Sequence, residues 1–112
     1  MTIKIEVTKR DITSFLPEHQ RTATCPVAKA LKRVGFRNPL VAYRGFHCSE
    51  SNDSRQFILL PSAAADFIVA FDKNSPAAKA SPFVFSLTLK KSLAEKIMFP
   101  KKFALLTEKK AA

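Results

Sequence analysis

The chain has 112 residues, of which 46% are hydrophobic and 25% charged. This length suffices for one domain with a core that needs no disulfide or metal. The 19 lysine and arginine residues outnumber the 9 acidic residues and give a formal net charge of +10, which attracts polyanions but does not specify a fold. The longest apolar stretch is interrupted by Arg55 and Asp66, which excludes a membrane-spanning helix there.

The N-terminal segment has the pattern of a half-buried β-strand. Ile3, Ile5 and Val7 alternate with polar residues, so one face of the strand is apolar. This alternation leaves no continuous apolar run, which predicts no secretory signal and therefore a cytoplasmic protein. We expect residues 9–23 to form a loop with a short turn near residues 11–16, because no hydrophobic period is sustained there.

The segment TCPVAKALKRV, residues 24–34, predicts an amphipathic helix. Thr24 or Cys25 is the expected N-cap, Pro26 suits the first helical position, and Gly35 ends the helix. The apolar residues share one face and the basic residues fall on the other. We therefore expect one face to be packed in the core and the other to be basic and exposed.

The middle of the chain predicts two strands and a second helix. Residues 40–44 form the first strand, which Gly45 closes and residues 46–48 resume beyond a bulge. After a polar loop, residues 56–60 form the next strand. The helix is expected to begin at Pro61, with Ser62 as its N-cap.

The C-terminal part begins with an expected loop at residues 72–82. Residues 83–89 then show the clearest alternation in the chain, and we expect this strand to lie centrally in a sheet. Residues 91–98 predict a short basic helix that Pro100 breaks. The apolar residues 103–106 are an expected anchor before a frayed end.

The order β-α-β-β-α-β predicts an α+β fold, with helices packed on one face of a mostly antiparallel sheet. We assign residues 1–90 to this compact domain. Residues 91–112 are a basic C-terminal extension, packed on the domain or trailing from it. A homodimer through an open sheet edge is compatible with this architecture.

Three segments resemble a pattern found in small uncharacterised proteins of bacteriophages and related mobile elements. They are CPVAKAL at residues 25–31, LPSAAADFIVAFD at residues 60–72 and PFVFSL at residues 82–87, and they match the pattern CPVAxAL…LPxxAxxFIxAFD…PFxFxL. The likeness covers residues 1–89. It implies an origin in a mobile element and residence in a bacterial host cell, and it brings no catalytic residues.

The sequence gives little support for catalysis or metal binding. A thiol at a helix start can be a nucleophile, but Cys25 has no partner at a fixed spacing. The possible zinc ligands are His19, Cys25, His47 and Cys48. They form neither a CxxC nor an HxxxH motif, and the chain's two glycines cannot make a phosphate-binding loop. We therefore expect no enzyme, metal, cofactor or disulfide.

Basic residues interleaved with aromatic residues are the remaining signal. A sheet that presents Tyr43 or Phe46 beside arginines can stack bases and contact phosphates. The lysines beyond residue 89 can add sequence-independent phosphate contacts. The candidate binding residues are Arg33, Arg37, Tyr43, Arg44, Lys90, Lys91, Lys96, Lys101 and Lys102.

We therefore expect a non-enzymatic protein that binds nucleic acid, either DNA or RNA, or a nucleoprotein complex. The alternative is a phage-encoded protein-binding module that inhibits or modulates a host defence or transcription complex. Cations gathered on one face with an exposed aromatic would favour nucleic acid. Scattered cations with an exposed apolar patch would favour a protein partner.

Overall fold

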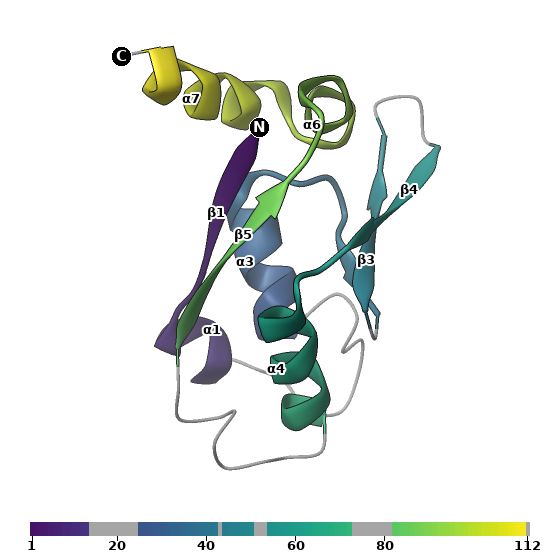
Figure 1. Ribbon diagram of the computed structural model, residues 1–112, viewed down its shortest axis with the longest axis vertical. Coiled ribbons are helices and arrows are strands. Elements are labelled where there is room, and N and C mark those ends of the chain that lie inside the picture. The colour runs from purple at the N-terminus through teal and green to yellow at the C-terminus, as the bar shows by residue number, and fades with distance from the viewer. Residues whose placement is uncertain (14–24, 43, 51–53, 73–81, 112) are drawn as a thin grey trace.

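The computed structural model describes residues 1–13, 25–42, 44–50, 54–72 and 82–111 (Figure 1). In chain order its elements are β1 Thr2–Val7, α1 Lys9–Thr13, α3 Pro26–Val34, β2 Leu40–Val41, β3 Gly45–Ser49, β4 Arg55–Leu59, α4 Ser62–Asp72, β5 Phe83–Thr88, α6 Lys91–Ile97 and α7 Pro100–Ala111. The fold class is α+β with antiparallel strand pairing, as the sequence predicts.

The strands form two sheets rather than one. β1 pairs with β5, and β2, β3 and β4 form a three-stranded sheet in that order. The expectation that residues 83–89 form a central strand is therefore wrong, because within the described chain β5 pairs with β1 alone. Hydrophobic alternation determines which face of a strand is buried, but not which strand lies beside it. α3 contacts both β1 and β2 and so connects the two sheets.

The segment expected as one interrupted strand from residue 40 is a hairpin. Leu40 of β2 lies opposite His47 of β3, and the Ala42 N–H closes the turn by donating to the Gly45 carbonyl at 2.8 Å. A Cβ atom at position 45 would collide with the Ile58 carbonyl and come within 2.7 Å of the Phe57 ring. Gly45 is therefore required by the close approach of β4 rather than by the end of a strand.

Helix α3 has the predicted ends. The Cys25 Sγ accepts a hydrogen bond from the Ala28 N–H at 3.4 Å, and Pro26 is the first helical residue. Gly35 follows the last turn with a φ of 123°, a conformation that favours glycine. A side chain at Gly35 would also collide with Lys102 of α7.

Helix α1 occupies part of the segment that was expected to be a loop. Thr8 and Asp11 cap it reciprocally: the Asp11 N–H donates to Thr8 Oγ1 at 3.2 Å, and the Thr8 N–H donates to Asp11 Oδ2 at 2.9 Å. The helix is too short to show a hydrophobic period, so the cap was its main sequence signal. The rest of that expected loop, residues 14–24, lies outside the described residues.

The core unites both sheets, α3 and the C-terminal extension in one small domain. Ala94, Ile97 and Met98 belong to the same buried cluster as the strands, and the Phe99 N–H donates to the Gly35 carbonyl at 2.8 Å. As predicted, the helix that begins at Lys91 ends before Pro100. Pro100 then begins α7, because proline is tolerated at the first position of a helix. In the described part of the chain, no helix is both long and apolar enough to cross a membrane.

Candidate nucleic-acid interface

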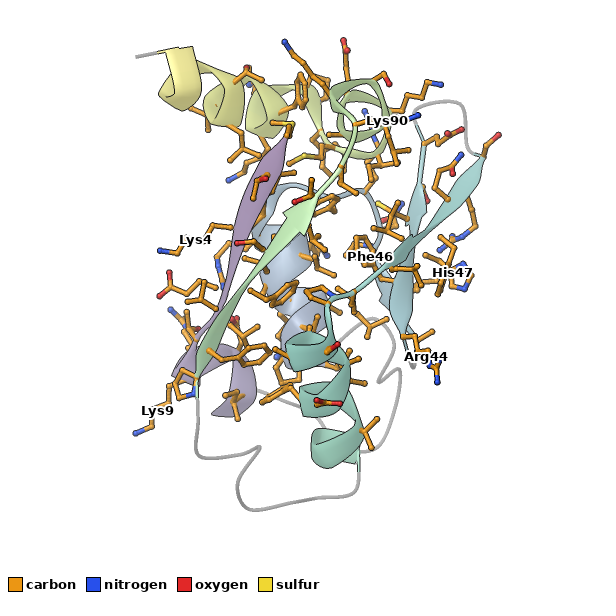
Figure 2. All side chains as sticks on the ribbon, viewed as in Figure 1. Lys4, Lys9, Arg44, Phe46, His47 and Lys90 are labelled. Atoms are coloured by element: carbon orange, nitrogen blue, oxygen red, sulfur yellow. The ribbon has the colours of Figure 1, made fainter. Side chains whose placement is uncertain are left out.

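The predicted binding residues fall into separate regions of the molecule. Lys90 lies beside α6 at one end, and Arg44 lies at the far end of β3 (Figure 2). We call the residues gathered around α6 and the first turn of α7 the basic cap. Its members are Arg37, Lys90, Lys91, Lys96, Lys101 and Lys102. Tyr43 lies outside the described residues.

The basic cap concentrates positive charge at one end of the fold. Residues 90–107 contain five lysines and one glutamate, Glu95, a formal net charge of +4. All five lysines are exposed. Because α6 is anchored in the core through Ala94 and Ile97, its lysines have a rigid support. A cluster of this kind produces a local positive potential beyond that of the average surface.

Arg37 also belongs to the basic cap, although it lies between α3 and β2, far from α6 in the sequence. Its N–H donates to the Ile97 carbonyl at 2.8 Å, and its guanidinium carbon lies 4.7 Å from the centre of the Phe99 ring. Phe99 is 45% exposed, so the ring of this cation–π pair is partly open to solvent, whereas Arg37 is half-buried and its Nε is buried. Arg37 and Lys96 also line an open pocket of about 620 Å³. Its other lining residues are Ser92, Glu95, Pro100 and Phe103.

Arg33, in contrast to Arg37, forms hydrogen bonds with other residues of the fold. Its Nη1 and Nη2 donate to the two Asp11 carboxylate oxygens at 2.7 and 2.8 Å, and Nη2 also donates to the Glu6 carbonyl at 2.7 Å. Burial alone would raise the pKa of Asp11, but the hydrogen bonds from Arg33 and Thr8 hold this pKa below its ordinary value of 3.8. This bidentate pair ties α1 to α3, so the Arg33 guanidinium has partners within the fold and is not part of the basic cap.

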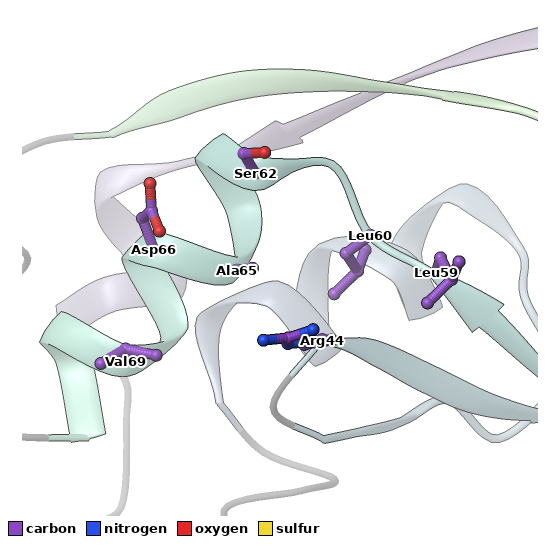
Figure 3. A pocket seen from close by; sticks show the side chains of 7 residues that line it. All are labelled: Arg44, Leu59, Leu60, Ser62, Ala65, Asp66 and Val69. Atoms are coloured by element: carbon purple, nitrogen blue, oxygen red, sulfur yellow. The ribbon is translucent and has the colours of Figure 1, made fainter.

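Arg44 lines a different feature, a groove of about 330 Å³ between the three-stranded sheet and α4 (Figure 3). Its backbone is fixed by the Leu60 N–H, which donates to the Arg44 carbonyl at 2.8 Å. The other lining residues are Leu59, Leu60, Ser62, Ala65, Asp66 and Val69. Since Arg44 lies far from the basic cap, the predicted arginines do not form one cluster.

Phe46 does not have the exposed position that the sequence suggested. It is fully buried and packs edge-to-face on Phe36, with ring centroids 5.4 Å apart. The next residue, His47, faces outward, and its ring centroid lies 4.9 Å from that of Phe57 on β4. Phe57 is 47% exposed. The sequence did not single it out, because Phe57, Ile58, Leu59 and Leu60 are consecutive apolar residues with no alternation to show which of them face solvent.

Neither cysteine is on the surface. Both are buried and unbridged, and the Cys48 thiol donates to the carbonyls of Arg37 and Ile97 at 3.0 and 3.3 Å. Burial raises the pKa of Cys48 to about 11. In the described part of the chain, no three or more His, Cys, Asp or Glu side chains gather as a metal site would require. His19, one of the possible ligands, lies outside the described residues.

Comparisons of the chain with protein-family models, with curated proteins and with solved structures found no match.

Proposed function

We propose that this chain is a non-enzymatic nucleic-acid-binding protein whose basic cap contacts the phosphate backbone. One observation carries the proposal: five exposed lysines and Arg37 gather around α6 and α7 beside the exposed Phe99 ring. A polyanion that neutralises such a cluster releases its condensed counterions, which drives binding without sequence specificity. The exposed ring adds a surface on which a base can stack.

The sharpest test compares two pairs of charge reversals. Lys91→Glu with Lys96→Glu alters the basic cap, whereas Lys4→Glu with Lys9→Glu alters the side of the molecule away from His47 and Arg44 (Figure 2). Each pair lowers the formal net charge from +10 to +6. A matched loss of global charge therefore separates a local site from general attraction.

The cap pair should weaken binding to a labelled single strand about tenfold at moderate salt and reduce the salt slope by about 1.4, since each lost phosphate contact removes about 0.7. The control pair should leave the slope nearly unchanged. Fluorescence anisotropy across a salt series measures both quantities, and thermal unfolding verifies that all variants fold. Equal weakening by the two pairs would show that only net charge matters and would reject the cap as a site.

A protein partner is the second candidate, and one observation favours it. Leu59 is 70% exposed and lies on the same sheet face as Phe57, so an apolar patch is open beside scattered arginines. In this candidate, a protein of phage or mobile-element origin docks on a host defence or transcription complex in the bacterial cytoplasm. Leu59→Lys should then abolish co-purification with that complex, while the cap pair should not.

A further inference from the structure

The three-stranded sheet has one face turned toward the core and one turned outward. Phe46 and Cys48 of β3 are buried, whereas His47 between them is exposed. In Figure 2 the Phe46 side chain points toward the body of the molecule and His47 points away from it. On β4 the alternation is the same: Ile58 is buried, and Phe57 and Leu59 are exposed. The outward face therefore carries aromatic and apolar side chains in contact with solvent.

The strand register arranges these side chains in rows. Gly45 lies opposite Leu59, His47 opposite Phe57, and Ser49 opposite Arg55. We call this set the outer face. Gly45 leaves space for the neighbouring ring, because a Cβ there would lie 2.7 Å from Phe57 Cζ and 3.0 Å from Cε2. The Phe57 ring of β4 therefore lies over Gly45 of β3, and 47% of the residue remains exposed.

Charge on the outer face is positive. Arg55 is exposed and lies two residues before Phe57 on the same strand, about 7 Å away, with its side chain on the same face. No residue of these three rows is acidic. An apolar protein surface would have to cover Arg55 without an evident counter-charge, whereas a nucleotide offers a base for the ring and a phosphate for the cation.

The outer face also adjoins the basic cap. Ser49 lies opposite Arg55, and the Ser49 N–H donates to the Arg37 carbonyl at 2.9 Å. The end of the β3–β4 pair at which Arg55 lies is therefore joined by a backbone hydrogen bond to Arg37. A single-stranded nucleic acid with one base stacked on Phe57 can continue past Arg55 toward the lysines of the basic cap.

We infer that the outer face is a stacking platform for unpaired bases, with Phe57 and His47 as the rings and Arg55 as the adjacent phosphate contact. This inference rests on the proposed function and specifies it: the preferred ligand is single-stranded DNA or RNA. Bases in a duplex are already stacked on one another and cannot lie on the Phe57 ring. A duplex can use only the basic cap.

The test uses the absence of tryptophan from the chain. Phe57→Trp introduces a single indole on the outer face, and Val84→Trp introduces one at a similarly exposed position, 49%, on β5. Titration with an oligothymidylate of about 16 nucleotides should quench the indole at position 57 and leave that at position 84 nearly unchanged. The same titration with a duplex of equal length should quench neither.

A second pair of variants measures affinity. Phe57→Leu should weaken single-strand binding about tenfold without affecting duplex binding, and Phe57→Tyr, which keeps a ring, should bind as the wild type does. If the single strand and the duplex both bind with a steep salt dependence but neither quenches an indole, the outer face is not a stacking platform and the proposed function stands. Absence of any binding refutes the proposed function too, and leaves the outer face to a protein partner.

Discussion

The ion pair between Asp11 and Arg33 should be a measurable structural contact, and a double-mutant cycle with Asp11→Asn and Arg33→Gln tests it. The Asp11 side chain is only 6% exposed, whereas that of Arg33 is 48% exposed. Exposed pairs contribute about 0–1 kcal/mol, and breaking a buried pair costs about 3–5 kcal/mol. For this half-exposed bidentate pair we expect a coupling of about 1–2 kcal/mol.

Asp11→Asn alone should cost about 2 kcal/mol, because it also removes the charged acceptor of the Thr8 N–H. For a chain of this length that corresponds to a fall in Tm of about 8 °C. Urea unfolding followed by circular dichroism at pH 7 gives the four free energies of the cycle. A coupling close to zero would refute the structural role assigned to Arg33.

The same pair predicts a pH dependence with a definite sign. Because the pKa of Asp11 is lowered in the folded state, its contribution is complete above the ordinary value of 3.8 and is lost as the pH falls through the lowered value. The stability gap between wild type and Asp11→Asn should be constant from about pH 7 to pH 5 and should shrink below about pH 4. A difference in stability that does not shrink below about pH 4 would contradict the lowered pKa of Asp11.

Two further predictions concern buried positions. With a pKa of about 11, Cys48 should be about one part in a thousand thiolate at pH 8, so iodoacetamide should leave it unmodified until the protein unfolds. Peptide mass mapping locates any alkylation. Rapid alkylation of Cys48 in the native protein would show that its thiol is accessible. Gly35→Ala should destabilise the fold by about 1–3 kcal/mol, because it forces a φ of 123° on alanine and brings its Cβ into collision with Lys102. Unchanged urea unfolding would contradict this packing of α3 against α7.

Local chemistry explains the parts of the fold that sequence reasoning found. The N-cap at Cys25, the proline at position 26 and the glycine at position 35 each satisfy a requirement of the helix ends, so α3 could be predicted almost to the residue. The alternation in β1 and β5 likewise determined their buried faces. These features depend on neighbours along the chain, which a sequence displays directly.

Sheet partners and ring exposure depend on contacts that are distant in sequence. The pairing of Thr2 with Thr88 joins residues that are 86 positions apart in the sequence, and nothing in either strand specifies it. Phe46 was expected on the binding surface and Phe57 was not, but Phe46 is buried opposite Ile58 and Phe57 is exposed opposite His47. Arg33 was grouped with the other arginines because its partner Asp11 lies 22 residues away.

The most direct test of nucleic-acid binding is fluorescence anisotropy of the wild-type protein with labelled single-stranded DNA, duplex DNA and RNA across a salt series. We predict that the affinity for the single strands falls steeply with salt, with a log–log slope of magnitude about 3 or more, corresponding to four or more phosphates. The duplex should bind more weakly. Affinities no stronger than those of an unrelated basic protein of similar net charge, or a loss of all binding at moderate salt, would contradict the account.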